Sequence, residues 1–208
     1  MFQFFKKHQK PLFEGLCDMH NHLLPSIDDG SKDVAMSSKM LEGYLALGFT
    51  SVIPTPHVYQ ELYPNTPETV KNAFGVLSEH CLKEEGVSVS SYGAEYMVDE
   101  VFMKNLESGI PALLLHKKYI LLEIHFFGAT TMLESACFQL QQKELRPILA
   151  HPERYHMIEG IAAYKALKNK GFYFQLNALS LMGHYGPQVK KKAEKLLQAG
   201  LYDLVATD

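Results

Sequence analysis

Two histidines separated by one residue are the first candidates for chemistry in this chain. His20 and His22 follow the short apolar segment Leu16-Cys17, and alternate residues of a β-strand project from the same side. Two neutral imidazoles on one side can hold a metal ion, and the carboxylates of Asp28 and Asp29 follow one loop later. Such a pair also arises by chance among ten histidines in 208 residues, so its meaning depends on the rest of the sequence.

More residues of metal-ligand type lie at or just beyond the ends of later apolar segments. Strands are predicted over residues 50–53, 87–92, 119–123, 147–150, 172–176 and 204–206. The polar residues at or after their carboxyl ends are His57, Glu95, Glu123, His151, Asn177 and Asp208. Polar residues at strand ends can simply satisfy backbone groups, but buried carboxylates without a counter-charge are costly. Metal ions supply that counter-charge, so the series predicts a metal site.

The elements that carry these residues alternate between strand and helix. With a first strand at Leu16-Cys17, seven apolar strands are separated by helical patterns, which cover residues 33–47, 66–85, 98–106, 130–143, 162–170 and 187–199. This alternation predicts an α/β fold with a parallel sheet and right-handed crossovers. A barrel of βα units gathers all strand ends at one mouth, whereas an open sheet spreads them along an edge. The convergence of so many potential ligands therefore favours a closed or nearly closed barrel.

Length and composition limit the class of protein. With 208 residues, 47% of them hydrophobic, the chain can bury one substantial core, and we expect an arm over residues 1–15 and a single domain over 16–208. A formal charge of −3 gives no indication of a basic surface that would bind nucleic acid. No apolar run approaches the ~20 residues of a membrane span, and no signal peptide is recognisable.

The three cysteines point to a reducing compartment. Cys17, Cys81 and Cys137 cannot all pair within the chain and form no C-x-x-C motif, which favours the cytoplasm. Cys81 follows a histidine, but a cysteine-dependent phosphatase loop would need an arginine six residues later, and position 87 is Val. We therefore interpret Cys81 as an ordinary packed thiol on a helix.

Several motifs together resemble the polymerase and histidinol phosphatase (PHP) superfamily of metal-dependent phosphoesterases. Within it, the chain looks most like the capsule-operon protein-tyrosine phosphatases of bacteria. The motifs are Asp18-Met-His20-Asn-His22, Asp28-Asp29-Gly30, Thr55-Pro56-His57, Glu95, Leu122-Glu123, Ala150-His151-Pro152-Glu153-Arg154 and Ala206-Thr207-Asp208. The resemblance covers almost everything beyond residue 15. It implies a distorted (β/α)₇ TIM-like barrel that holds two to three divalent metal ions.

The resemblance also implies roles for individual residues. His20, His22, Glu95 and Asp208 would bind the first metal. Glu95 would bridge to a second, held by Glu123 and His151. Asp29 and His57 would hold a third, with Asp28 as the alternative to Asp29. Arg154, whose planar fork matches phosphoryl oxygens, would join Glu95 and His57 in catalysis.

The chain departs from the family pattern at its last residue. The family's final motif is Asp-x-His, and this sequence stops at Asp208, two residues before that histidine and before the closing helix. Either this sequence is truncated at this point, so that we expect a barrel domain lacking its C-terminal end, or the third metal site is incomplete. An incomplete third site could lose one metal ion and much activity.

The expected function follows from the metals. Neighbouring divalent ions can activate and orient a bridging water and neutralise charge on phosphate oxygens, so we expect phosphomonoester hydrolysis. Imidazole and carboxylate ligands suit manganese, which we favour, but also iron or zinc, and magnesium stays open. The resemblance implies a phosphotyrosine protein as substrate, an autophosphorylated bacterial tyrosine kinase of capsule synthesis; oligomerisation stays open. The alternatives are a small-molecule phosphatase of the histidinol-phosphate type and a catalytically impaired metal-binding regulatory module.

Overall fold

The computed structural model describes residues 11–81, 86–125 and 130–208. Most of the expected arm, residues 1–10, lies outside these ranges. The strands are β1 (Cys17–Asp18), β2 (Ser51–Val52), β3 (His57–Val58), β4 (Glu95–Met97), β5 (Tyr119–Glu123), β6 (Arg146–Ala150), β7 (Tyr173–Asn177) and β8 (Leu204–Ala206). The helices are α1 (Val34–Leu47), α2 (Pro67–Cys81), α3 (Glu100–Glu107), α4 (Thr130–Gln142), α5 (Gly160–Asn169), α6 (Ala178–Met182) and α7 (Pro187–Gln198), with a 3₁₀ turn, η1, at Pro152–Arg154.

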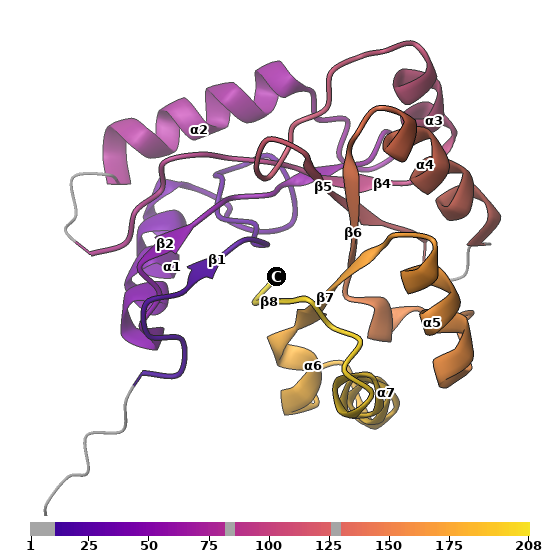
Figure 1. The fold of residues 1–208 in the computed structure, drawn as a ribbon. Helices are drawn as coiled ribbons and strands as arrows, with labels where there is room; N and C mark the ends of the chain where they lie inside the picture. Colours follow the sequence, from indigo (N-terminus) through magenta and orange to yellow (C-terminus); the bar gives the residue numbers. More distant parts are fainter. Residues whose placement is uncertain (1–10, 82–85, 126–129) are drawn as a thin grey trace, which may run out of the picture.

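Two parallel sheets confirm the α/β class. Strands β1 and β2 pair in a two-stranded sheet, and β3 to β8 pair in sequence order in a six-stranded sheet. Helices lie around the outside of the strands, as Figure 1 shows. Strand pairing closes neither sheet into a barrel over the described residues.

Apolar residues cover both faces of the large sheet, as expected for parallel strands. Leu122, Leu149 and Phe174 belong to the cluster that packs against the surrounding helices. Leu121 and Ile148, one residue out of phase, belong to a smaller cluster with the partly buried Met19 and Ile53, which directly follow β1 and β2. Alternate residues of β5 and β6 therefore supply two different cores.

The helix ends follow from local hydrogen bonding. The Asp33 carboxylate accepts a hydrogen bond from Met36 N (2.8 Å) at the start of α1, and Gly48 ends this helix in the left-handed conformation, φ 94°. The Asp99 carboxylate caps α3 through Phe102 N at 2.7 Å. Helices α1, α4, α5 and α7 match the sequence prediction to within two residues. Residues 82–85 of the helix predicted after Thr66 lie outside the described ranges.

The prediction of a strand over residues 87–92 is wrong. Only Ser88 forms a bridge there, with Ser51, and the strand that carries Glu95 begins at Glu95 itself. The predicted strand would run beside Pro54 and Pro56, which lack backbone N–H donors, so regular pairing stops. Pairing resumes at His57, which begins β3 instead of following a strand.

Two short helical segments were absent from the sequence prediction. Helix α6 has only five residues, and its start is set by the Asn177 side chain, which accepts a hydrogen bond from Leu179 N at 2.9 Å. The turn η1 directly follows His151, whose backbone is left-handed at φ 32°. Both lie at the carboxyl ends of strands, beside the potential ligands.

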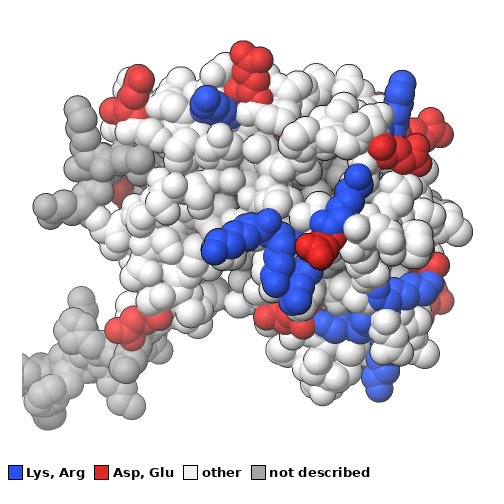
Figure 2. All heavy atoms as spheres, turned by 45° about the horizontal axis from the view of Figure 1, so that its top comes forward, with Lys and Arg blue, Asp and Glu red and all other residues white. Residues whose placement is uncertain are grey.

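Charged side chains of both signs cover the surface. On the face shown in Figure 2, basic side chains gather near the centre with an acidic one among them. At the amino ends of β5 and β6, a hollow of about 620 Å³ is lined by Lys117, Lys118, Lys143, Arg146 and Glu144, among other residues. None of the helices in the described ranges combines the length and apolar character needed to cross a membrane.

Side chains at the carboxyl ends connect the two sheets. The buried Asp18 carboxylate at the end of β1 accepts hydrogen bonds from Thr207 N (3.1 Å) and Thr207 Oγ1 (2.6 Å), just beyond β8. Asp208 N also donates to His20 O at 2.8 Å. The end of the chain therefore lies against the first strand (Figure 1).

We predict that Thr207→Val weakens this connection, because it removes a hydrogen bond to a buried carboxylate and keeps the side-chain shape. The free energy of unfolding of the metal-free protein should fall by about 1–3 kcal/mol in urea titrations. Thr50→Val is the control, since the exposed Thr50 hydroxyl makes only a long 3.4 Å contact with Leu16 O. A Thr207→Val protein as stable as the Thr50→Val protein would contradict the prediction.

Candidate metal centre

The predicted site residues converge on one side of the parallel strands: most lie at or beyond carboxyl ends, whereas His57 and Glu95 begin the short strands β3 and β4. The set comprises His20, His22, Asp29, His57, Glu95, Glu123, His151, Arg154 and Asp208. Their strands lie side by side in the six-stranded sheet or pair as β1 and β2, and the register places His57 opposite Glu95 and Met97 opposite Glu123. Residues up to 188 positions apart in sequence therefore come together.

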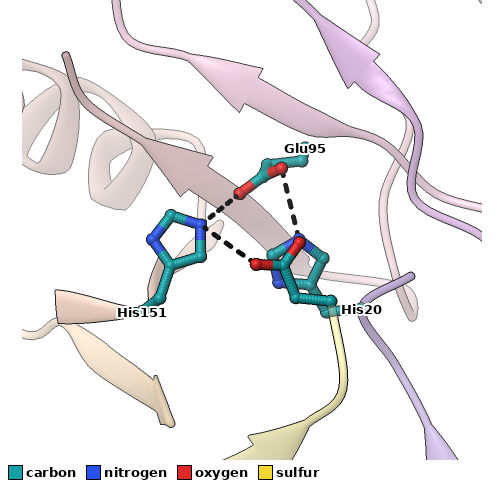
Figure 3. A group of neighbouring side chains, drawn as sticks. His20, Glu95 and His151 are labelled. Atoms are coloured by element: carbon teal, nitrogen blue, oxygen red, sulfur yellow. Dashed lines mark hydrogen bonds and ion pairs between the residues drawn. The ribbon is translucent and has the colours of Figure 1, made fainter. Parts of the chain in front are cut away.

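Glu95 lies at the centre of the site. Its carboxylate is fully buried. Oε2 lies 3.2 Å from His20 Nε2, 3.1 Å from His57 Nδ1 and 3.7 Å from His22 Nε2. Oε1 lies 3.0 Å from His151 Nε2. One carboxylate thus contacts four imidazoles, and Figure 3 shows His20 and His151 turned toward it from two sides.

Asp208 divides its two oxygens between different partners. Oδ1 lies 3.1 Å from His22 Nε2 and 3.3 Å from His20 Nε2. Oδ2 accepts hydrogen bonds from Arg154 Nη1 at 2.9 Å and Asn177 Nδ2 at 2.7 Å. Asp208 therefore links the histidine cluster to the only arginine among the predicted site residues.

The third group of ligands is more open. His57 Nδ1 lies 2.9 Å from Glu123 Oε1, and His57 Nε2 lies 3.5 Å from Asp29 Oδ1. The Asp29 side chain is 61% exposed, whereas that of Asp28 is fully buried. Asp29 is therefore the carboxylate at the solvent side of this group.

Asp28 has a different environment from Asp29. It accepts hydrogen bonds from His22 Nδ1 at 2.8 Å, Gly30 N at 3.0 Å and His57 N at 3.1 Å. Burial raises the pKa of Asp28, but the hydrogen bonds from these partners and the nearby His22 lower it by more, so the pKa lies below its usual value. Because Asp28 accepts a hydrogen bond from Nδ1 of His22, this nitrogen carries a proton and Nε2 faces Glu95 and Asp208. Carboxylates orient metal-binding histidines in the same way.

Gln175 orients a second histidine, and sequence reasoning missed it. Its Oε1 lies 2.9 Å from His20 Nδ1 and accepts a hydrogen bond from His151 N at 3.3 Å. Gln175 lies two residues before Asn177 on β7, so the two side chains share one side of the strand. That period-two relation was the available signal.

Glu153 is also buried, but its carboxylate is bonded to groups other than the imidazoles. Its Oε1 accepts hydrogen bonds from Asn177 N at 3.0 Å and Ser180 Oγ at 2.7 Å, and its Oε2 accepts one from Tyr202 Oη at 2.9 Å. Three donors satisfy this carboxylate without a cation. Glu153 therefore fixes η1 against α6 and is a structural residue next to Arg154.

The donor set fits a metal ion. Among the described residues, His20 Nε2, His57 Nδ1 and Glu95 Oε2 have no hydrogen-bond partner, although they are buried and lie close together. Three sets of side chains have ligand atoms within 4.8 Å of one another: His20, Glu95, His151 and Asp208; His22, His57 and Glu95; and His22, Asp28 and Asp29. Converging imidazole nitrogens and carboxylate oxygens are the donors that divalent metals take.

The site carries an excess of negative charge that its histidines compensate by protonation. Burial lowers the pKa of His20, but Glu95 and Asp208 raise it more strongly, to about 9. For His57, burial again lowers the pKa, and Glu95 and Glu123 raise it to about 12. The pKa of Glu95 lies well below its usual value because the nearby histidines outweigh its burial. The carboxylates thus stabilise positive charge at this position.

The site opens into a cavity of about 1140 Å³. Polar residues including His22, His57, Glu123 and Arg154 line its floor, and Leu62 and Met182 lie among its apolar lining. The Tyr63 ring stacks on His57 with ring centroids 5.3 Å apart. A cavity of this kind suits a ligand with an anionic end and an apolar body.

The fold and the site together define an α/β protein with a cluster of potential metal ligands at the carboxyl ends of its parallel strands. The chain belongs to the CpsB/CapC family of capsular polysaccharide synthesis, whose family model matches residues 16–208. The family predicted from the sequence motifs is therefore confirmed.

Characterised relatives resemble the chain over most of its length. It is 32% identical over 194 residues to the tyrosine-protein phosphatase YwqE of Bacillus subtilis, covering 93% of this chain and 76% of that protein. It is 24% identical over 199 residues to the tyrosine-protein phosphatase CpsB of Streptococcus pneumoniae, covering 93% and 82%.

A solved structure has the same fold. The comparison gives a TM-score of 0.82 with 32% identity and covers 92% of this chain and 78% of the other. That structure comes from work on YwqE and CpsB, which are described as unique metal-dependent tyrosine phosphatases.

We predict that Gly30→Ala displaces His22. An added Cβ would lie 2.2 Å from both Cβ and the carbonyl oxygen of His22, closer than any real contact. Stability should fall by about 1–3 kcal/mol, and metal affinity, measured by competition with a chromogenic chelator, should fall at least about tenfold.

Gly43→Ala is the matched control for Gly30→Ala. Gly43 lies in α1 with nothing within 4 Å of an added Cβ, so alanine should leave metal affinity unchanged and stabilise the helix by up to about 1 kcal/mol. Equal metal affinities for the two variants would show that Gly30 does not set the position of His22.

Proposed function

We propose that this chain is a metal-dependent phosphomonoesterase that removes phosphate from phosphotyrosine in proteins. The observation that carries the proposal is the arrangement around Glu95, whose buried carboxylate contacts four imidazoles, three of which line a large cavity. The substrate class is supported by YwqE and CpsB, which are named tyrosine-protein phosphatases and share the fold and most of the chain length.

The proposed cofactor is a group of two to three divalent metal ions. The ligands would be His20, His22, Asp29, His57, Glu95, Glu123, His151 and Asp208. Manganese is the ion we propose first, with iron, zinc or magnesium as alternatives, because mixed imidazole and carboxylate donors suit this group of metals.

The distances support a shared role for Glu95 in this scheme. Its Oε2 faces His20, His22 and His57, and its Oε1 faces His151. A carboxylate between two sets of imidazoles can bridge two ions. The ligand atoms of His20, Glu95, His151 and Asp208 lie within 4.8 Å of one another, so this set could hold one ion. His57, which lies close to both Glu123 and Asp29, could contribute with them to the binding of another ion.

The chain's own groups would bind and orient the phosphoryl group. Arg154 lines the cavity beside Asp208, and we propose that its planar fork holds phosphoryl oxygens. Asp28 and Gln175 would keep His22 and His20 turned toward Glu95. When bound, the ions would supply Lewis-acid stabilisation of the phosphoryl oxygens and a lowered pKa for a nearby water.

We also propose that the two sheets are parts of one distorted (β/α)₇ TIM-like barrel of the PHP type. Backbone hydrogen bonds that bridge the gaps support this: Asp208 N to His20 O (2.8 Å) on one side, and Val52 N to Ser88 O (2.9 Å) and Gly93 N to Pro54 O (2.8 Å) on the other. The inner apolar cluster, to which Leu121, Ile148 and Met19 contribute, would be its filling.

The biological setting is proposed from the family. Its description concerns capsular polysaccharide synthesis, so an autophosphorylated bacterial tyrosine kinase of that system is the partner we propose. The free thiols of Cys17 and Cys137 support a cytoplasmic location. We propose residues 16–208 as one catalytic domain.

The proposal predicts chelator-sensitive hydrolysis of p-nitrophenyl phosphate and of a tyrosine-phosphorylated peptide. EDTA should abolish turnover and added Mn²⁺ should restore it. His20→Ala should lower kcat/KM at least about 100-fold, because it removes a ligand and leaves Glu95 without one of its partners. Released phosphate and bound metal, measured by elemental analysis, are the readouts.

His80→Ala is the control for this experiment, since His80 is an exposed residue of α2 that contacts Val76 O. Turnover that survives EDTA, or that His20→Ala leaves intact, would refute the proposal. Preference for histidinol phosphate over the peptide would indicate the small-molecule alternative. Metal binding without turnover would indicate a regulatory module.

A further inference from the structure

Tyr185 lies on the turn between α6 and α7, beside the cavity. Its ring lies under the Arg154 guanidinium, with Cζ 4.4 Å from the ring centroid. At this distance the ring's negative face attracts the cation, and a planar guanidinium can stack on it. The ring therefore covers one side of the group that we propose to hold the phosphoryl oxygens.

A hydrogen bond fixes the ring at its other end. Asn177 Nδ2 donates to Tyr185 Oη at 3.0 Å and also to Asp208 Oδ2 at 2.7 Å. Asp208 Oδ2 in turn accepts from Arg154 Nη1 at 2.9 Å. Arg154, Asp208, Asn177 and Tyr185 thus form a closed ring of contacts. One end of the guanidinium is held by Asp208 and its flat face by Tyr185.

The turn itself is shaped to present the tyrosine. Gly183 (φ 82°) and Gly186 (φ 91°) both have positive φ angles, which favour glycine, and Gly186 N donates to Gly183 O at 3.0 Å. The His184 ring packs edge-on against Tyr185 with ring centroids 4.9 Å apart. The position of Tyr185 is therefore set by the backbone as well as by its contacts.

We propose that Tyr185 is a positioning residue, which holds the Arg154 guanidinium in the plane that receives phosphoryl oxygens. This inference rests on the proposed phosphatase function and adds to it a residue that acts only through Arg154. Arginine carries many rotamers, and ordering its long side chain costs conformational entropy. The aromatic face would add a contact that favours one plane of the guanidinium before substrate binds.

The first test compares Tyr185→Leu with Tyr185→Phe in Mn²⁺-loaded protein, using p-nitrophenyl phosphate. Tyr185→Leu should lower kcat/KM about threefold to thirtyfold. Most of the loss should come from a higher KM, because Arg154 contacts phosphoryl oxygens in both ground and transition states. Tyr185→Phe keeps the ring and should recover most of the loss. A merely structural role would reduce the active fraction, which lowers kcat and leaves KM unchanged.

The second test repeats the Tyr185→Leu change in an Arg154→Ala background. If Tyr185 acts through Arg154, the Arg154→Ala protein and the Arg154→Ala/Tyr185→Leu protein should have nearly equal kcat/KM values. Tyr59→Leu is the control, a like change in another tyrosine of the cavity lining. It should change kcat/KM by the same factor in the wild-type and the Arg154→Ala backgrounds. An undiminished Tyr185→Leu effect in the Arg154→Ala background, or a Tyr185→Phe protein as impaired as Tyr185→Leu, would overturn the inference.

A third measurement separates this inference from the proposed function. The ¹⁵N-ε signal of Arg154 in the metal-free protein should show a more rigid side chain in wild type and Tyr185→Phe than in Tyr185→Leu. If no variant hydrolyses phosphate esters, the proposed function fails while this readout still decides the positioning role. Equal Arg154 mobility in all three proteins would overturn that role.

Discussion

The structure depends on the concentration of carboxylates in a buried place, around Glu95. Glu95, Glu123, Asp208 and Asp28 lie within or beside one cluster of imidazoles, where an uncompensated negative charge would be strongly unfavourable. Positive charge in the cluster offsets that cost. Glu95 and Asp208 raise the pKa of His20, which favours its protonated form in the metal-free chain, and the buried His20 Nε2 and Glu95 Oε2 without hydrogen-bond partners are suited to a divalent ion.

The fold supplies this cluster by aligning strand ends and by a second layer of orienting groups. Parallel pairing of β3 with β4 puts His57 beside Glu95, and the apolar cores on both faces of the sheet fix that register. Asp28 and Gln175 then set which nitrogen of His22 and His20 faces inward. The close approach of Gly30 to His22 shows that the backbone, as well as the side chains, is adapted to this arrangement.

Much of this could be predicted from the sequence, for reasons that the structure makes clear. His20, His22, Glu123 and His151 end or follow short apolar strands, and the carboxyl ends of parallel strands must meet at one side. The central place of Glu95 was implied by the family resemblance alone, since strand patterns could not show it: it depends on the register of β3, a two-residue strand after two prolines. The alternating pattern of residues 87–92 predicted a strand that is not formed, because the pattern carries no information on the neighbouring prolines, which lack N–H donors. The orienting role of Gln175 depends on its contact with His20, 155 residues away, and that of Asp28 on the conformation of the loop that follows His22.

The most direct test of the account is a crystal structure of the Mn²⁺-loaded protein with anomalous diffraction recorded near the manganese edge. The account predicts anomalous peaks at about 2.0–2.3 Å from the carboxylate oxygens of Glu95, with imidazole nitrogens of His20, His22, His57 or His151 completing the coordination. Peaks confined to surface carboxylates, with Glu95 bonded only to protonated histidines, would contradict it.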